Sequence, residues 1–374
     1  MQLVPRQRNM LRAIWRAGQL SRRDLHEATG IRPNTVGSDV AVLLAQHILR
    51  ECRSTISGRG RPQVPLEIDP NHRQVVGLAI RPGYIETGQL NLLGQLSAQA
   101  RNKMPADPAE LLNTLREALR KNVNDLTLAV GISAPGFVDA NRGALLSGSA
   151  VTGSGPLNLQ PAYKAAGSVP ILLENDMHAL AARWLLAHHA EPHEDVLLVY
   201  FEDGQLGSAL LVNGRPNRGC VVGANELGHT RFPVETDICF CGHMGCLERI
   251  CSTSFLLRSS RALGTLPERA ARFNGTDTAM KRMLDLLAMG FANAVNFTRV
   301  NRLVLVSELN RHAQFVQYLT TAIRAHVLGE IKERVRLDFW DQPAARSAET
   351  AGWLALASFY YEGWNDPAAT DTPP

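Results

Sequence analysis

Three cysteines within eight residues form the densest group of potential metal ligands in the sequence. Cys239, Cys241 and Cys246 lie in the segment CFCGHMGC, and Cys251 follows closely. Zinc prefers four tetrahedral nitrogen or sulfur ligands, and the intervening glycines allow a short loop to fold its sulfur atoms around one centre. The spacing therefore predicts one structural Zn²⁺ per chain, with free buried thiols as the alternative.

The fourth zinc ligand has two candidates. His243 lies inside the loop, so close in sequence to the cysteines that sharing one metal with them would strain the backbone. His229 stands ten residues before Cys239, in the segment NELGHT. We expect His229, Cys239, Cys241 and Cys246 to be the ligands. Clustered cysteines also favour metal over disulfide in a reducing compartment.

The first part of the chain is strongly basic. Residues 1–62 contain eleven Arg, no Lys and four acidic residues, whereas the whole chain of 374 residues has a net charge of +4. A basic head on a mildly acidic body favours a polyanion as the partner of the head. Charge alone is equally compatible with a merely soluble basic surface.

The head also has the element order of a DNA-binding domain. Helices are expected over residues 5–18, 21–28 and 33–46, with Ser21 as N-cap of the second and Asp24 at its capping-box position. Gly30 separates the second helix from the third. Strands over residues 48–53 and 63–68 follow, around the loop STISGRGRP. Residues 1–70 are therefore predicted to be a winged helix-turn-helix domain.

In this domain type the third helix enters the major groove with its N-terminal side chains at the base edges. Arg can pair with guanine and Asn with adenine, and Arg also suits a narrow minor groove. The side chains expected to meet base edges are Arg32, Asn34, Thr35, Ser38 and Asp39, and those expected at the wing tip are Arg59 and Arg61. A helical trio used for protein contacts is the alternative.

Beyond residue 75 the sequence alternates short apolar strands with helices and glycine-rich turns, which is typical of α/β proteins. Strands are expected in VVGLAI, LTLAVGIS, VPILLEN, VLLVYF, SALLVNG and RLVLVSE, and helices near residues 107–121, 175–189, 253–262, 277–297, 311–333 and 346–362. The tail 366–374 is expected to be disordered. The first residues lack the apolar segment of a signal peptide, and no run suits a membrane span, which predicts a cytoplasmic protein without membrane insertion.

Several of these segments resemble one family. CFCGHMGCLERICS is similar to the C-x-C-G-x-x-G-C-x-E-x-x-x-S signature of the ROK family (repressors, open reading frames and sugar kinases). ANELGH, LLENDMHALAA and GISAPGFVD resemble further segments of that family in the same order. The resemblance covers most of residues 75–362, and the winged head fits the family's repressor branch.

The resemblance implies an actin-like fold of two ribonuclease-H-like lobes, with a sugar site in the cleft between them. The lobes would be residues 71–190, with the helix 346–362 packed back on them, and residues 191–345, with the zinc site and dimer contacts. Carried onto this sequence, the sugar-binding residues would be Asn175, Asp176, Glu226, His229 and Glu248. Without the family, Asn175 and Asp176 read as a helix cap, and Glu226 and His229 as a surface pair.

The same resemblance argues against kinase activity. Family kinases hold ATP with glycine-rich turns whose N–H groups bind phosphate. Here the first turn reads Ala-Ile-Arg-Pro-Gly over residues 79–83, so its acid is absent and its proline has no N–H. The second has Gln205 and Ala209 in place of glycines, and the third has Ser307 and Glu308. Asp176, which would be the general base of a kinase, is then expected to serve in binding only.

The sequence thus predicts a transcriptional regulator, a repressor of carbohydrate genes, that responds to a sugar or sugar phosphate. It is expected to bind operator DNA as a homodimer or a higher homo-oligomer. The stretch 280–297 is a candidate dimer element, with an internal core helix as the equal alternative. One rival is an active sugar kinase with an appended DNA-binding head. Another is a regulator whose effector is a protein.

Overall fold

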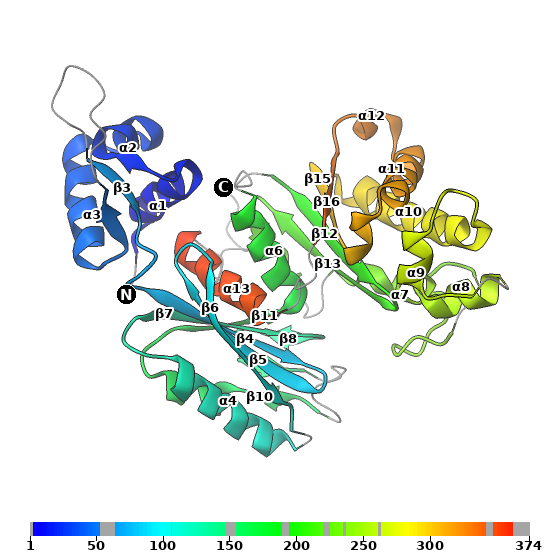
Figure 1. Ribbon diagram of the computed structural model, residues 1–374, viewed down its shortest axis with the longest axis horizontal. Coiled ribbons are helices and arrows are strands. Elements are labelled where there is room, and N and C mark those ends of the chain that lie inside the picture. Colours follow the sequence, from blue (N-terminus) through cyan, green and yellow to red (C-terminus); the bar gives the residue numbers. More distant parts are fainter. Residues whose placement is uncertain are drawn as a thin grey trace. The chain divides into compact units, whose positions relative to one another are not determined.

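The computed structural model describes residues 3–52, 64–105, 107–146, 155–188, 194–219, 225–234, 237–260, 263–341 and 347–361. The chain divides into two compact units, Met1–His189 with Arg346–Pro374, and Ala190–Ala345. The first unit therefore contains the basic head, the segment that follows it and the last helix. Figure 1 labels the elements of each unit along the sequence.

The head consists of three helices and a small antiparallel sheet. Its elements are α1 (Pro5–Ala17), β1 (Leu20–Ser21), α2 (Arg22–Thr29), α3 (Pro33–Ala45), β2 (Leu49–Glu51) and β3 (Pro65–Ile68), with the strand order β1-β3-β2. Met10, Leu25 and Val40, one from each helix, are fully buried. Ser21 accepts the N–H of Asp24, and the Asp24 carboxylate accepts the N–H of Ser21, so the predicted capping box is confirmed. The strand β1 is an addition to the predicted elements.

The rest of the first unit is built on a five-stranded sheet of order β11-β7-β4-β5-β6. Its strands are β4 (Gln74–Arg81), β5 (Tyr84–Asn91), β6 (Leu96–Lys103), β7 (Thr127–Ala134) and β11 (Ile171–Asn175), and the short strands β8 (Val138–Asp139), β9 (Ala144–Leu145) and β10 (Leu157–Asn158) form a separate sheet. The helices are α4 (Pro108–Asn122), α5 (Gln160–Tyr163), η1 (Lys164–Ala166), α6 (Asp176–Ala187) and α13 (Ala348–Tyr360).

Helices α4 and α13 cover opposite faces of this sheet, as Figure 1 shows. Val76, Leu78 and Ile80 of β4 share a buried cluster with Leu115 of α4. On the other face Gly77 allows α13 to approach closely, because a Cβ there would lie 1.8 Å from the Ala348 carbonyl oxygen. The last helix is therefore fitted against the sheet of the first unit.

The second unit repeats this design with the strand order β14-β13-β12-β15-β16. Its strands are β12 (Val196–Glu202), β13 (Gln205–Val212), β14 (Arg215–Pro216), β15 (Arg302–Val306) and β16 (Arg336–Trp340). In each five-stranded sheet the first three strands along the chain form an antiparallel meander. The fourth strand pairs in parallel with the first, and the fifth pairs in parallel with the fourth. The helices are η2 (Leu227–His229), α7 (Leu247–Ile250), α8 (Thr253–Ser259), α9 (Leu266–Ala271), α10 (Thr278–Thr298), η3 (Glu308–Arg311), α11 (Ala313–His326) and α12 (Gly329–Lys332).

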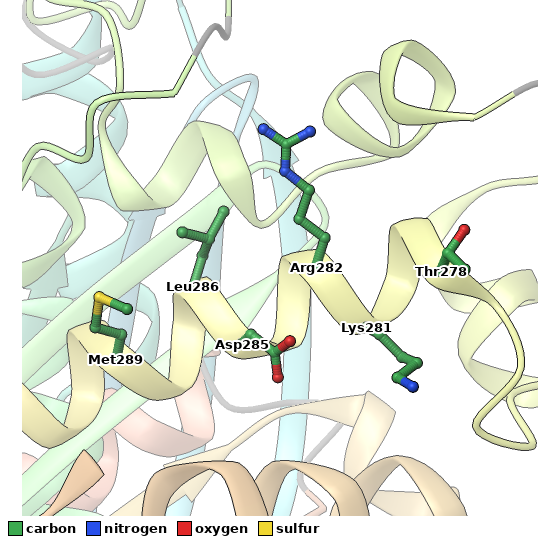
Figure 2. Close-up of a pocket in the computed structure, with 6 residues that line it drawn as sticks. All are labelled: Thr278, Lys281, Arg282, Asp285, Leu286 and Met289. Carbon is green, nitrogen blue, oxygen red and sulfur yellow. The ribbon is translucent and has the colours of Figure 1, made fainter. Parts of the chain in front are cut away.

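Helix α10 is a core helix of the second unit with an exposed outer face. Met283, Leu287 and Phe291 are fully buried at helical spacing. Figure 2 shows outward side chains of the same helix, which line a surface hollow: Thr278, Lys281, Arg282, Asp285, Leu286 and Met289. Near its end Phe297 is 89% exposed. The predicted element thus has both a core stripe and a solvent face.

Some expected elements differ in the structure. The single helix expected over residues 311–333 is wrong, because α11 ends at His326, Val327 is extended, and α12 begins only at Gly329. Strands β5, β6 and β16 were not predicted. Among the residues that the structure describes, no helix combines the length and the apolarity that a membrane span needs.

Candidate functional site

The cysteine loop brings the four predicted zinc ligands together. One ligand atom from each of His229, Cys239, Cys241 and Cys246 lies within 4.8 Å of the others. Cys241 Sγ is 3.5 Å from Cys246 Sγ, and Cys239 Sγ is 3.6 Å from His229 Nδ1. The other candidate, His243, has its Nδ1 3.7 Å from Cys241 Sγ.

Backbone pairing explains how His229 reaches the loop. The N–H of Phe232 donates to the Gly245 carbonyl, and the N–H of Leu247 donates to the Thr230 carbonyl. Gly245 has a φ of 81°, and a Cβ there would lie 2.2 Å from the Phe232 carbonyl oxygen, so only glycine fits this crossing. The two segments therefore run side by side and place the imidazole next to the thiols.

The thiols of this cluster influence each other's ionisation. Burial raises the pKa of Cys246 to about 12, and the neighbouring thiols add to the increase. Burial acts in the same direction on Cys241, but hydrogen bonds with the backbone and ring of His243 lower its pKa to about 7. Crowded thiols that resist joint ionisation are a donor set that a divalent cation stabilises, because the cation replaces their protons. The residues present thus fit zinc.

The three predicted sugar residues of the second unit lie around this cluster. Glu226 Oε2 is 3.8 Å from His229 Nε2, so the ring presents one nitrogen to Cys239 and the other towards a carboxylate. Glu248 is 9% exposed on α7, and its Oε2 accepts the N–H of Leu206. The short helix η2 connects Glu226 to His229 and passes Glu248 at Gly228, where a Cβ would lie 3.5 Å from the Glu248 Cβ.

The other two predicted sugar residues lie in the first unit, where β11 meets α6. Asn175 caps α6, since its Oδ1 accepts the N–H of Met177, and its Nδ2 donates to the Gly136 carbonyl. The cap that the sequence alone suggested is therefore present, and Asn175 also holds the turn of the GISAPGFVD segment. Asp176 follows as the first helical residue and is 3% exposed.

Asp176 is paired with an arginine that sequence reasoning did not assign to the site. Arg81 Nη1 donates to Asp176 Oδ2 at 2.6 Å, and the two side chains are 13% and 5% exposed. A charge-assisted bond in such a buried place is strong. Arg81 belongs to the turn in which the acid of the family kinases is absent. In the sequence, the only indication that Arg81 pairs with Asp176 was its position in that turn.

A carboxylate occupies the third of the turns that correspond to nucleotide-binding turns, at Ser307 and Glu308. Glu202, at the end of β12, accepts the N–H of Glu308 at 2.6 Å and the hydroxyl of Ser307 at 3.4 Å. Burial raises the pKa of Glu202, an effect that the Glu308 N–H opposes. A backbone N–H that could bind a phosphate oxygen is thus already occupied by a carboxylate of the same unit, a contact that the sequence did not reveal.

The side chains predicted to read bases lie at the start of α3, with one exception. Arg32, Asn34 and Ser38 are exposed and Thr35 is half-buried. The prediction that Asp39 faces the bases is wrong, because its side chain is buried, at 3% exposure. Its carboxylate accepts hydrogen bonds from Arg6 Nε at 2.6 Å and from Gln7 Nε2 at 3.2 Å. It ties α3 to α1 instead of facing outwards. Arg59 and Arg61 lie outside the described residues.

Two sheets of the same strand order, each with helices on it, define an α/β protein of the sugar-kinase-like class. The ROK family profile matches residues 83–358, so the chain belongs to the ROK family. The xylose repressor of Bacillus subtilis (strain 168) is 22% identical over 343 residues, which cover 87% of this chain and 88% of that protein.

Solved structures agree with this fold. A ROK family transcriptional regulator, described as a homologue of the E. coli Mlc protein, superposes with a TM-score of 0.75 at 20% identity and covers 96% of this chain and 98% of its own. A ROK hexokinase from Thermus thermophilus gives a TM-score of 0.61 at 22% identity, covering 76% of this chain and 99% of its own. The regulator thus matches the fold of nearly the whole chain, including the residues before the family profile.

Proposed function

We propose that this protein is a sugar-responsive DNA-binding transcriptional regulator, acting as a repressor. The observation that carries the proposal is the combination, in one chain, of a ROK body with a basic three-helix head and small sheet. The xylose repressor reported above aligns with 87% of this chain. The solved structure of a ROK transcriptional regulator superposes on 96% of this chain. A kinase-like body alone would not need such a head.

In this proposal the head is a winged helix-turn-helix domain, and α3 enters the major groove. Arg32 and Asn34 are exposed at the first turn of α3 and would bind base edges, with Thr35 and Ser38 beside them. Arg59 and Arg61 would contact the minor groove from the wing. Each bidentate pair with the correct base is worth about 1–3 kcal/mol of discrimination. Arg32→Ala should therefore relax specificity at one base position.

The body would hold zinc at His229, Cys239, Cys241 and Cys246, and a sugar at Asn175, Asp176, Glu226, His229 and Glu248. Zinc, when bound, would fix the tautomer and orientation of His229. Carboxylates, an amide and an imidazole are groups that suit adjacent hydroxyls, which both donate and accept hydrogen bonds. Xylose and other aldoses, each with and without phosphate, are the first probes for a thermal-shift screen, because a ligand of the native state must stabilise it.

The body would bind sugar without phosphorylating it. Asp176 is held by Arg81 at 2.6 Å, which opposes its taking a proton from a hydroxyl. Glu202 occupies the N–H of Glu308, and both carboxylates would repel a nucleotide phosphate. The alternative, a ROK kinase with an added head, is tested by ATP-dependent phosphorylation across the same sugars. Turnover at ordinary kinase rates would overturn this part of the proposal.

Helix α6 offers a route from the sugar residues to the head. Asp176 is its first residue, and near its other end the carbonyl of Leu186 accepts the indole N–H of Trp15, on α1, at 3.3 Å. A 12-residue helix spans about 18 Å. The Trp15 ring also contacts Trp353 and Tyr360 of α13, with centroid distances of 5.9 Å and 5.1 Å. We propose that a sugar at Asp176 acts on the head through this contact.

The regulator would bind DNA as a homodimer. Phe297 is 89% exposed at the end of α10 and Leu328 is 53% exposed. Asn296 bridges the two segments, because its side chain bonds the His326 carbonyl and the Leu328 N–H. Sedimentation of Phe297→Glu against the unchanged chain tests this contact. A variant that sediments like the unchanged dimer would exclude Phe297 from the interface, and an unchanged chain that sediments as a monomer would exclude the homodimer.

A protein effector is the remaining alternative, and the sugar screen separates it from the proposal. A stabilising sugar or sugar phosphate supports a small-molecule effector. If no sugar or sugar phosphate of the screen shifts the unfolding temperature while operator binding is intact, a partner protein is favoured as the effector.

A further inference from the structure

We propose a second transition-metal site, formed by His47, Asp69 and His72 where the head joins the rest of the first unit. One ligand atom from each residue lies within 4.8 Å of the other two. Two imidazoles and a carboxylate suit ions such as Zn²⁺, Ni²⁺ or Co²⁺. The site shares no residue with the proposed zinc, sugar or DNA contacts, so it does not depend on the proposed function.

Asp69 is the fixed ligand. It follows β3, is 3% exposed, and its N–H donates to the Ile48 carbonyl at 2.8 Å. Its Oδ1 accepts the N–H of Asn71 at 2.9 Å, and its Oδ2 is 2.7 Å from His72 Nδ1. A buried carboxylate held by backbone groups presents its second oxygen at a set place, which is the support that a metal ligand needs.

The two histidines lie over each other beside this oxygen. Their ring centroids are 4.8 Å apart and the planes differ by 24°. Zinc lies about 2.0–2.1 Å from a histidine nitrogen, so ligand atoms on one ion are roughly 3.3 Å apart. Because His47 and His72 are both exposed, their side chains can rotate over the short distance that remains. When the ion binds both atoms, neutral His72 would carry its ring proton on Nε2, so that Nδ1 and Asp69 Oδ2 each offer a lone pair.

The backbone of His47 gives an independent reason to expect a role. Its φ is 54°, the left-handed region that few residues other than glycine adopt. It ends the turn after α3, where its N–H donates to the Leu44 carbonyl. Histidine adopts this region more often than most residues, but a non-glycine residue with a positive φ is still uncommon and is a pointer to function. A ligand role for the imidazole would account for it.

One nearby charge opposes the ion. Arg73 donates to the Gln46 carbonyl at 2.9 Å and to the Asp125 carbonyl at 3.1 Å, so its guanidinium is held close to the turn. It lowers the affinity for a dication but occupies none of the proposed ligand atoms. We therefore expect weaker binding than at the three cysteines. The bound ion would tie the turn that follows α3 to the segment that leads into β4.

Cobalt distinguishes the two sites, because thiolate ligands give an intense charge-transfer absorption and imidazole or carboxylate ligands do not. The full-length chain is first loaded with one equivalent of Zn²⁺, which binds nitrogen and sulfur ligands more tightly than Co²⁺. It is then dialysed against excess Co²⁺, and both metals are counted by mass spectrometry. We expect one zinc and one cobalt per chain, without a thiolate band.

Two substitutions should each remove the cobalt and leave the zinc. They are His47→Asn, in which asparagine still tolerates the left-handed backbone, and His72→Gln. The matched control is His326→Gln, an exposed histidine on α11, which should keep both ions. The proposal is overturned if the unchanged chain takes up no cobalt, if both variants retain it, or if the control loses it equally. Should one variant unfold by circular dichroism, the other decides.

Discussion

The contact of Trp15 with α6 and α13 gives the sharpest prediction about regulation. Trp15→Phe removes the indole N–H that donates to the Leu186 carbonyl at 3.3 Å and keeps an aromatic ring in place. Trp15→Ala removes the ring as well, and with it the contacts to Trp353 and Tyr360. The two variants therefore separate the hydrogen bond from the aromatic packing.

The magnitudes follow from the contacts. One hydrogen bond between neutral groups contributes about 1 kcal/mol net, which corresponds to a factor of about 5. Each aromatic pair adds about 0.5–1.5 kcal/mol. Trp15→Ala should thus lose about 2–4 kcal/mol, as much as a typical allosteric coupling of about 1–3 kcal/mol. We expect Trp15→Phe to reduce the effect of sugar on DNA affinity several-fold, and Trp15→Ala to abolish it.

The assay is fluorescence anisotropy with a duplex selected from a random library by the full-length protein. The dissociation constant is measured with and without the sugar that gives the largest thermal shift, and the ratio of the two constants is the coupling. Trp340→Phe, the same substitution on β16 of the second unit, should leave the ratio unchanged.

The route through α6 would be refuted by a folded Trp15→Ala variant in which sugar changes the dissociation constant for DNA by the same factor as in the unchanged chain. A variant that loses DNA affinity by the same factor with and without sugar would also refute it, because its ratio would be unaltered. An unchanged chain without any sugar response would instead count against the sugar effector itself.

Three further predictions concern stability and metal content. The unchanged chain should contain about one zinc ion by metal analysis and Cys241→Ser almost none, because a structural site needs all four ligands; a Cys241→Ser chain with full zinc would exclude this ligand. Gly37→Ala should stabilise the head by about 1 kcal/mol in thermal unfolding, since helix propensity improves and a Cβ there meets no atom within 4 Å. Gly77→Ala should instead destabilise the first unit, because its Cβ would lie 1.8 Å from the Ala348 carbonyl oxygen. Equal effects of the two substitutions would contradict this reasoning. Arg81→Met should cost about 3–5 kcal/mol in chemical denaturation, because it removes the charged partner that Arg81 supplies to the buried Asp176 carboxylate. If stability is unchanged, the ion pair does not contribute to it.

The features that could be predicted from the sequence are those set by neighbours along the chain. The capping box at Ser21 and the stripe of α10 follow from spacing alone, and the cysteine loop carries three ligands within eight residues. The strand β6 was missed because all its residues are exposed, so no alternation of apolar side chains marks it.

Contacts between distant residues could not be predicted. Arg81 and Asp176 are 95 positions apart, and only the pairing of β4 with β7, and of β7 with β11, brings them together. Asp39 looked like a base reader because of its place on α3. Its burial depends on Arg6 and Gln7 of another helix. Tertiary packing, rather than local pattern, decides such side chains.

The effect of sugar on operator binding tests the account most directly. The dissociation constant of the full-length, zinc-loaded protein for its selected duplex is measured at fixed salt, with and without each sugar and sugar phosphate of the panel. We predict tight, sequence-dependent binding and at least one ligand that changes the constant five-fold or more, as about 1 kcal/mol of coupling requires. Binding that ignores the duplex sequence, or a constant that no ligand of the panel alters, would contradict it.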